Sequence, residues 1–266
     1  MTLRSNTLFG GENKVQIAIE RIMAHCPPEG YILAFSGGKD SCVCNDLLRQ
    51  SGVPYRKIYN VVPVDPPELI RFIREYHPDA ERKRPKRSLI AGVRSHGLPT
   101  RFRRWCCEEW KHGRNEDGIY VLGVRWAESV KRKTSWRMFQ HCAKVDSFTL
   151  CPIIDWTDAE IWQYIRERQI PYCSLYDKGF DRLGCVMCPL VNSPGNTSRL
   201  EADMARWPKI ARAWRRGADA QFEYLLERDG ENRYHKTADE LWTWWISGCP
   251  GRDHDALLDF EEESEE

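Results

Sequence analysis

The chain is organised around the segment Tyr31-Ile32-Leu33-Ala34-Phe35-Ser36-Gly37-Gly38-Lys39-Asp40-Ser41. Its first half is an apolar run that is too short for a helix, so it predicts a buried strand. The serine and the two glycines break this strand into a tight turn, and residues 42–50 continue with apolar residues at helical spacing. The segment therefore predicts a strand, a glycine-rich turn and the beginning of a helix.

A turn of this kind is suited to binding an anion. Backbone N–H groups point outward at the start of a helix, the helix dipole favours negative charge, and glycine lets a phosphate approach closely. Lys39 adds a point charge, and serine hydroxyls add donors. We expect the phosphate or sulfate end of a nucleotide to contact Ser36, Gly37, Gly38, Lys39, Asp40 and Ser41. Asp40 either hydrogen-bonds at the helix start or coordinates Mg²⁺.

Further strands and helices alternate along the chain. Apolar runs predict strands at residues 55–64, 118–123 and 150–154, and helical spacing predicts helices at 13–25, 68–76 and 158–168. Such alternation indicates an α/β fold, a Rossmann-like parallel sheet with helices on both faces. Ligands of such sheets bind beyond the carboxyl ends of the strands. Asp65 and Arg125 each follow a predicted strand, so both are candidates for this edge.

Composition narrows the class of protein. Among 266 residues, 40 Lys and Arg balance 39 Asp and Glu, so no bulk charge indicates nucleic acid or membrane as a partner. No apolar stretch approaches membrane-spanning length and the N-terminus lacks a signal-peptide pattern, so we expect a cytoplasmic protein. A basic stretch at residues 82–104 predicts a solvated surface, with Arg103 and Arg104 near a site. A nucleic-acid patch is the alternative there.

The eleven cysteines separate by spacing. Cys106 and Cys107 are adjacent, and Cys185 and Cys188 form a C-x-x-C pair, whereas the others show no pairing. In a cytosolic chain such cysteines favour metal binding or catalysis over disulfides. Thiolates without a partnering histidine fit iron–sulfur chemistry, and a redox pair at Cys185 and Cys188 is the alternative.

Taken together, these segments resemble the phosphoadenosine-phosphosulfate reductase family, an iron–sulfur type within the adenine nucleotide α-hydrolase-like (PP-loop) group, closest to its phage and phosphorothioation-type relatives. The matching pieces are residues 36–41, 106–107, 123–125 with 128–129, 152–157, and 176–179 leading into 184–189. The resemblance implies that an adenine nucleotide, ATP or adenylyl sulfate, also contacts Gly123, Arg125, Glu128 and Ser129. It also implies that a [4Fe–4S] cluster is held by Cys106, Cys107, Cys185 and Cys188. Lys39, Asp40 and Arg125 are the expected catalytic residues.

The resemblance has one departure, which bears on the reaction. Sulfonucleotide reductases of the family carry a cysteine in a C-terminal Glu-Cys-Gly-Leu/Ile-His segment, and this sequence shows only Cys249 in a different context. We therefore expect an ATP-dependent sulfurtransferase that releases pyrophosphate and works with a sulfur donor or reductant protein. The alternatives are a sulfonucleotide reductase that releases sulfite and a component of a nucleic-acid modification system. The expected domains are residues 1–190, which bind nucleotide and cluster, and a helical extension at 191–266.

Overall fold

The computed structural model describes residues 4–7, 10–112, 116–143, 147–191, 196–232 and 234–249. The chain divides into two compact units. Unit 1 comprises Met1–Asn60, Pro67–Lys83 and His112–Leu183, and unit 2 comprises Val61–Pro66, Arg84–Lys111 and Gly184–Glu266. The units interleave along the sequence, whereas the predicted division was a single boundary at residue 190. The segments that carry the four predicted cluster cysteines thus belong to the same unit as the C-terminal helices. The predicted domain boundary remains a prediction.

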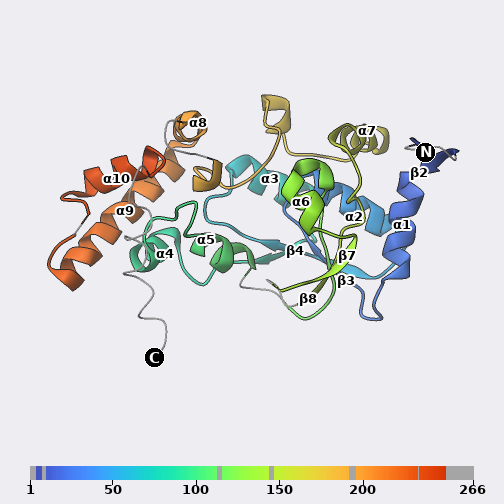
Figure 1. The fold of residues 1–266 in the computed structure, drawn as a ribbon, viewed down its shortest axis with the longest axis horizontal. Coiled ribbons are helices and arrows are strands. Elements are labelled where there is room, and N and C mark those ends of the chain that lie inside the picture. Colours follow the sequence, from blue (N-terminus) through green and yellow to red (C-terminus); the bar gives the residue numbers. More distant parts are fainter. Residues whose placement is uncertain are drawn as a thin grey trace. The chain divides into compact units, whose positions relative to one another are not determined.

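Unit 1 contains a six-stranded sheet in the order β5-β4-β3-β6-β8-β7 (Figure 1). Its strands are β3 (Tyr31–Ala34), β4 (Tyr55–Asn60), β5 (Glu81–Lys83), β6 (Tyr120–Val121), β7 (Phe139–Cys142) and β8 (Ser147–Leu150). All neighbouring strands are parallel except β7, which pairs antiparallel with β8 at the edge. This arrangement confirms the predicted α/β fold with a parallel sheet.

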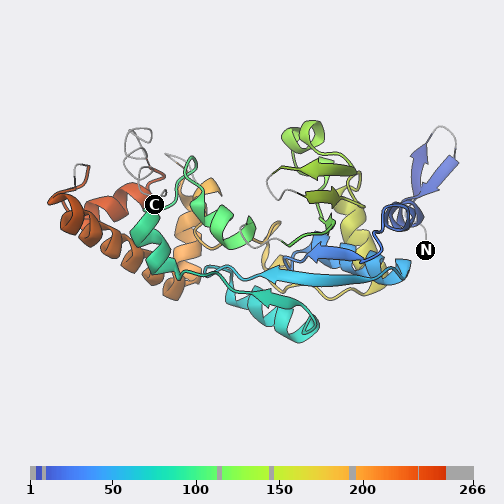
Figure 2. The same cartoon turned by 90° about the horizontal axis from the view of Figure 1, so that it is seen from below.

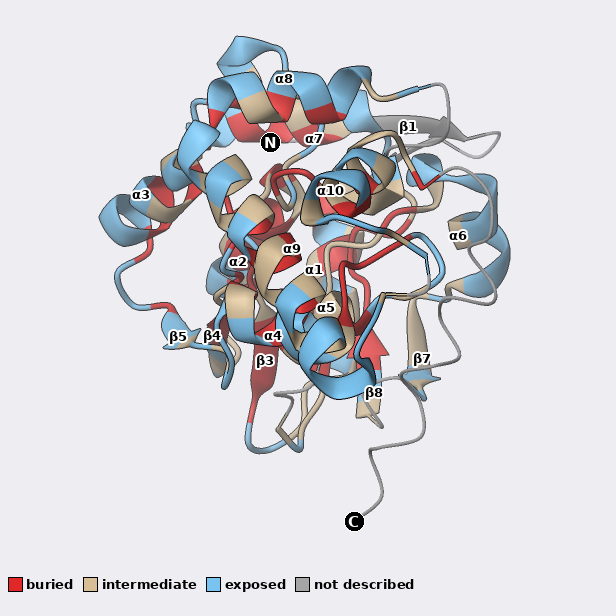
Figure 3. Cartoon of the chain, turned by 90° about the vertical axis from the view of Figure 1, so that its left-hand side faces the viewer, coloured by how far each residue is buried: buried red, intermediate tan, exposed pale blue. Residues whose placement is uncertain are grey.

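The helices of unit 1 are α1 (Lys14–Ala24), α2 (Lys39–Ser51), α3 (Pro67–Tyr76), α6 (Val130–Ser135) and α7 (Asp158–Arg168), with short 3₁₀ turns η2 (Trp126–Glu128) and η3 (Tyr176–Lys178). Figure 2 shows the same elements from below, with α3 (cyan) along the edge of the sheet that β4 and β5 form. A separate hairpin of β1 (Arg4–Thr7) and β2 (Gly10–Asn13) leads into α1. Figure 3 shows β3 as a buried strand, as its apolar run predicts.

The predicted strands differ from the observed ones in extent: the strand expected at 118–123 is reduced to Tyr120–Val121, and two others differ as follows. The strand expected at 55–64 ends at Asn60, because the chain leaves the sheet there and continues into unit 2. The strand expected at 150–154 is wrong, because only Leu150 lies in β8 and a turn follows it. That turn closes with the Ile154 N–H donating to the Cys151 carbonyl. Apolar character there reflects burial of Ile153 and Ile154 rather than strand pairing.

Unit 2 is helical and contains no strand among its described residues. Its helices are α4 (Leu89–His96), α5 (Trp105–Cys107), α8 (Ser198–Arg206), α9 (Pro208–Asp229) and α10 (Ala238–Ile246), with the π-helical turn η1 (Glu108–His112) at the unit boundary and the 3₁₀ turn η4 (Pro189–Val191). Aromatic rings fill its interior: Trp110, Trp214 and Trp245 are almost fully buried, with Trp214 and Trp245 ring centres 5.1 Å apart. The predicted helical character of the C-terminal part is confirmed. No helix in the described part of the chain combines the length and apolarity needed to cross a bilayer.

Candidate functional site

The glycine-rich turn of unit 1 has the backbone that its sequence predicts. β3 ends at Ala34, and α2 begins at Lys39 with Gly38 as its N-cap and no side chain capping it. Gly37 lies in the left-handed region at φ 71°, and a Cβ there would approach Leu69 Cδ1 to 2.7 Å. Glycine is therefore required by both backbone conformation and space. Gly38 has no side chain to cap α2, so the start of this helix has no side-chain cap from its N-cap residue.

Two serine hydroxyls brace the turn. The Ser41 hydroxyl donates to the Gly38 carbonyl over 2.8 Å, and Ser36 Oγ accepts from the Gly38 N–H over 3.3 Å. The hydroxyls of Ser36 and Ser41 also lie 3.3 Å apart. Ser36 is exposed while Ser41 is buried, so Ser36 is the hydroxyl that faces solvent. The structure therefore brings both predicted serines to the same turn.

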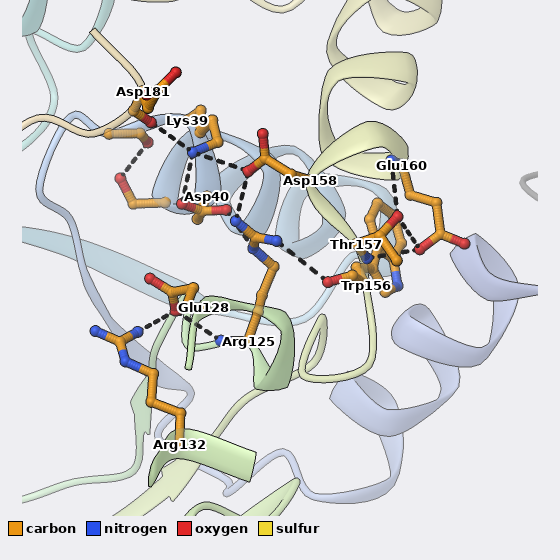
Figure 4. Close-up of polar contacts among 12 residues, drawn as sticks. Lys39, Asp40, Arg125, Glu128, Arg132, Trp156, Thr157, Asp158, Glu160 and Asp181 are labelled. Carbon is orange, nitrogen blue, oxygen red and sulfur yellow. Dashed lines mark hydrogen bonds and ion pairs between the residues drawn. The ribbon is translucent and has the colours of Figure 1, made fainter. Parts of the chain in front are cut away.

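Lys39 is a buried cation surrounded by oxygen atoms (Figure 4). Its ammonium lies 3.2 Å from Asp158 Oδ1 and 3.8 Å from Asp40 Oδ2, and it donates to the Asp181 carbonyl over 3.1 Å. The backbone N–H of Lys39 donates to the Tyr176 hydroxyl over 2.9 Å. The ring of Tyr176 also lies 5.6 Å from the ammonium. Lys39 is thus fixed at the helix start from several sides.

Arg125 is buried and binds carboxylates of its own unit (Figure 4). Its Nε donates to Asp40 Oδ1 over 2.7 Å, one terminal nitrogen to Asp158 Oδ1 over 3.0 Å, and the other to the Trp156 carbonyl over 3.3 Å. The guanidinium therefore connects the start of α2 with the start of α7. Burial raises the pKa of the Asp40 carboxyl, while Arg125 and Lys39 act in the opposite direction.

The residues around Arg125 have local structural partners. A Cβ at Gly123 would lie 2.9 Å from Asp40 Cβ, so glycine there permits the close approach of the chain to α2. The Glu128 carboxylate accepts from the Arg125 N–H over 3.0 Å and pairs with Arg132. Ser129 caps α6 by accepting from the Arg132 N–H over 3.2 Å. These contacts orient the segment that carries Arg125.

Unit 2 holds all four of the predicted cluster cysteines. The C-x-x-C loop is fixed by its backbone: the Met187 N–H donates to the buried Asp203 carboxylate over 2.8 Å, and the Val186 N–H donates to the Val64 carbonyl over 2.9 Å. The Val186 carbonyl accepts from the Trp214 indole over 3.3 Å. Met187 itself lies in the left-handed region at φ 59°, so these bonds hold a turn of limited intrinsic stability.

The adjacent cysteines follow a buried tryptophan. The Trp105 indole donates to the Gly97 carbonyl over 3.0 Å, and its ring fills the space at Gly92, where a Cβ would meet the ring at 2.6 Å. The Arg104 guanidinium lies 3.7 Å from the Cys107 sulfur, so Arg104 lies near the cysteines, as predicted. Both cysteines are half-buried.

The four thiols influence one another electrostatically. A hydrogen bond between Cys106 and Cys107 lowers the pKa of Cys107 to about 5 and raises that of Cys106, which Cys185 and Cys188 raise further. Burial opposes the charge on Lys111, yet Cys185, Asp65 and Cys107 outweigh it and raise the pKa of that ammonium. Among the described residues, no three His, Cys, Asp or Glu side chains are grouped to hold a metal ion.

All the predicted nucleotide contacts belong to unit 1 except Asp65, and the structure adds several residues. Asp65 belongs to unit 2, so its predicted nucleotide contact stays a prediction. Sequence reasoning missed Tyr176, Asp158, Lys111 and Asp203, which contact predicted site residues. Lys111 carried a readable signal, since it follows Cys107 by one helical turn. Asp158 lay in a recognised helix-start pattern and was interpreted only as part of a cap.

Known proteins resemble this chain over most of its length. An uncharacterised protein of Methanocaldococcus jannaschii is 28% identical over 228 residues, 80% of this chain and 45% of that protein, so the chain spans less than half of that relative. An adenosine 5′-phosphosulfate reductase of Bacillus anthracis is 29% identical over 180 residues, 63% of this chain and 79% of the enzyme.

Solved structures show a more distant likeness. A phosphoadenylyl-sulfate reductase from Candida auris, in a phosphate complex, has 16% identity and a TM-score of 0.49 over 70% of this chain and 98% of its own. The family described as the phosphoadenosine phosphosulfate reductase domain matches residues 30–191, which is more than half of the chain. The chain belongs to this family.

Proposed function

We propose that this chain binds ATP or an adenylyl nucleotide at residues 36–41 and uses it to transfer sulfur to an acceptor, with release of pyrophosphate. One observation carries the proposal: α2 begins directly after a buried strand, without a side-chain cap, and the buried ammonium of Lys39 lies at its first turn. Uncapped N–H groups, a helix dipole and a cation all stabilise a phosphate or sulfate group.

Each loop residue has a role in the proposal. Backbone N–H groups at Gly37 and Gly38 and the exposed Ser36 hydroxyl bind the terminal phosphates. Lys39 stabilises the negative charge that develops on departing pyrophosphate, in place of its present contacts with carboxylate oxygens. Asp40 lies in the first turn of α2, where its carboxylate is oriented by Arg125. Arg125 acts through Asp40 in this proposal, because its own donors are occupied by protein oxygens.

The proposed reaction has two displacements. An acceptor oxygen attacks the α-phosphorus of ATP, the bond to the β-phosphate oxygen breaks, and pyrophosphate leaves with the electron pair. A hydrosulfide-class donor then attacks the activated carbon, the carbon–oxygen bond breaks, and AMP leaves. Sulfur at the sulfide level replaces oxygen, so the sequence needs no oxidant or reductant.

The thiol chemistry of unit 2 supports an iron–sulfur cluster, although among the described residues the four thiols are not grouped as a metal site. Cys106, Cys107, Cys185 and Cys188 are four half-buried thiols that affect one another's pKa values, and all belong to one unit. They would hold a [4Fe–4S] cluster through their sulfurs. When bound, such a cluster supplies a site for sulfur or for electron transfer.

The second candidate function is reduction of adenylyl sulfate to sulfite. The Bacillus anthracis relative, which carries the name adenosine 5′-phosphosulfate reductase, favours it. That reaction requires an accessible thiol to attack the sulfur atom, with a thiol reductant supplying the electrons. In unit 2 the described part of the chain offers Cys249 besides the four predicted cluster cysteines, but that thiol is buried. The ATP reaction is therefore the first candidate.

The test uses protein purified without oxygen. Calorimetric titration with ATP and with adenylyl sulfate should show binding that is lost in Ser36→Ala/Lys39→Ala. Lys133→Ala/Ser135→Ala removes the same residue types from exposed positions on α6 and should bind as wild type does. Incubation with each nucleotide then separates pyrophosphate release from sulfite release. Equal affinity in the folded loop variant and wild type would remove residues 36–41 from the site.

A further inference from the structure

The outer face of α9 carries a row of exposed cations, which we call the α9 stripe: Lys209, Arg212 and Arg216. Their spacing of three and four residues places them on one side of the helix, over about 10 Å at 1.5 Å per residue. The opposite side is buried and includes Trp214 and Ala218. Figure 1 shows α9 as the long orange helix of unit 2. The stripe therefore faces away from the core of its own unit.

The stripe does not serve the stability of the helix. Cations stabilise the C-terminal end of a helix and acids the N-terminal end. The first turn of α9 contains Lys209 and no acid, whereas its last turn contains the cation Arg228. No side chain caps this N-terminus, where the N-cap residue is Trp207. The helix dipole therefore gives Lys209 no stabilising role, and its effect does not reach Arg212 and Arg216 in the middle of the helix.

Ion pairing within the protein does not explain the stripe either. The neighbouring charges are matched: Arg215 pairs with Asp219 at 2.9 Å and Asp239 at 2.7 Å, and Glu227 pairs with Arg94 at 3.0 Å. Among the described residues, the three stripe cations have no hydrogen-bond or ion-pair partner. The charged residues beside the stripe are thus paired within the protein, whereas the stripe cations are available to an external anion.

We propose that the α9 stripe binds the phosphate backbone of a nucleic acid. A duplex carries about one negative charge per 1.7 Å of its axis, so a 10 Å row of cations faces several phosphates at once. Two of the three cations are arginines, whose planar forks suit phosphate oxygens.

This inference stands independently of the proposed nucleotide chemistry. The stripe lies in unit 2 and needs no ATP or cluster to bind phosphate. The net charge of the whole chain is only +1, so the attraction is local to the stripe. Contacts of this type are with the backbone, so binding should depend strongly on salt and little on base sequence.

Fluorescence anisotropy with a labelled 30-base-pair duplex and a labelled single-stranded RNA tests the proposal without added nucleotide. Lys209→Gln/Arg212→Gln/Arg216→Gln should weaken binding about tenfold or more at low salt and make the slope of log K against log salt shallower by about 2–3. Arg71→Gln/Arg74→Gln/Arg166→Gln removes three exposed charges from helices of unit 1 and should alter neither quantity by a similar amount.

Two further measurements complete the test. Lys209→Arg/Arg212→Lys/Arg216→Lys keeps the charges and should retain binding, and circular dichroism should show wild-type helix content in every variant. Unchanged affinity and salt slope in the glutamine variant would overturn the proposal. So would wild-type protein that ignores both nucleic acids and binds phosphatidylserine vesicles through the stripe, since that result assigns the face to a membrane surface.

Discussion

At the scale of single residues, Arg125 shows how the site is built. Sequence position placed it at the carboxyl edge of the sheet as a ligand for an anion. The structure places it at that edge but directs its donors to Asp40, Asp158 and the Trp156 carbonyl. A buried guanidinium requires such partners, because an unpaired buried charge is strongly destabilising. In the proposed function, Arg125 therefore contributes by orienting Asp40.

Arg125→Met should lower the free energy of unfolding by about 3 kcal/mol, because it leaves the partly buried Asp40 carboxylate without its main partner. Arg132→Met is the matched control, since Arg132 pairs with Glu128 nearer the surface and should cost less than about 1 kcal/mol. Urea unfolding followed by fluorescence measures both. Equal losses in the two variants would show that the buried network contributes nothing special.

His77 should make the free energy of unfolding depend on pH. It is buried, its ring lies 4.5 Å from that of Phe35, and its Nε2 lies 3.9 Å from the Cys42 sulfur. Burial and the ammonium of Lys57 lower its pKa from 6.5 to about 4, while Asp79 acts in the opposite direction. Between these values the unfolded chain binds a proton that the folded chain does not.

The free energy of unfolding should therefore fall as the pH is lowered from about 6.5 to about 4, by at most about 1.4 kcal/mol per pH unit from this residue. Above pH 6.5 His77 should have no such effect. His77→Gln removes the titration and should flatten the profile in this window, measured by urea unfolding at half-unit steps. An unchanged slope in that variant would assign the pH dependence to other groups.

At the scale of elements, the sequence was most informative where signals are local. The helix at 158–168 was predicted and is confirmed, and adjacent residues cap it: Thr157 Oγ1 accepts from the Glu160 N–H over 3.3 Å, and Glu160 accepts from the Thr157 N–H over 2.7 Å. The glycine-rich turn was predicted for the same reason, because adjacent residues in the sequence indicate both a left-handed glycine and the start of a helix. Such features need no knowledge of the remote chain.

Features that depend on distant segments were not predictable. The antiparallel edge strand β7 pairs with β8, and nothing in its own sequence indicates the direction of pairing. Asp65 was assigned by its position after a strand, but β4 ends at Asn60 and the chain passes into unit 2 first. Likewise, Asp203 lies sixteen residues beyond Met187, and only the folded chain shows that it holds the C-x-x-C loop.

Asp203→Ala should loosen the C-x-x-C loop, because it leaves the Met187 N–H buried without its acceptor. We expect fewer iron and sulfide ions per chain in anaerobically purified protein, whereas Asp203→Asn keeps an acceptor oxygen and should retain more. Asp219→Ala, which removes a partner of Arg215 on α9, is the control and should bind iron as wild type does. Iron content equal in all four proteins would separate Asp203 from the cluster site.

At the scale of the whole molecule, the two units divide the proposed chemistry. Unit 1 contains the glycine-rich turn, Lys39 and Arg125, and unit 2 contains the four cysteines and the α9 stripe. The chain passes between the units several times, so each is built from segments far apart in sequence. Neither unit is a continuous stretch that could be produced by a simple truncation. Variants in the full chain are therefore the appropriate tests of both.

Cys249 is where the two candidate reactions differ. It belongs to unit 2, directly after α10, its thiol is buried, and its backbone lies in the left-handed region at φ 57°. Its N–H donates to the Trp244 carbonyl, which closes the end of the helix. A thiol that attacks adenylyl sulfate must reach the sulfur atom, and the burial of Cys249 prevents this. Cys249 thus has the features of a structural residue.

Cys249→Ser should therefore retain nucleotide-dependent pyrophosphate release, and wild-type protein given adenylyl sulfate and a thiol reductant should yield no sulfite. Both products are measured in the same anaerobic preparation, with Cys142→Ser as a control at a half-buried cysteine of unit 1. Sulfite that forms with wild type and Cys142→Ser but disappears with Cys249→Ser would reverse the choice. The chain would then be a sulfonucleotide reductase whose nucleophile becomes exposed when the end of α10 opens.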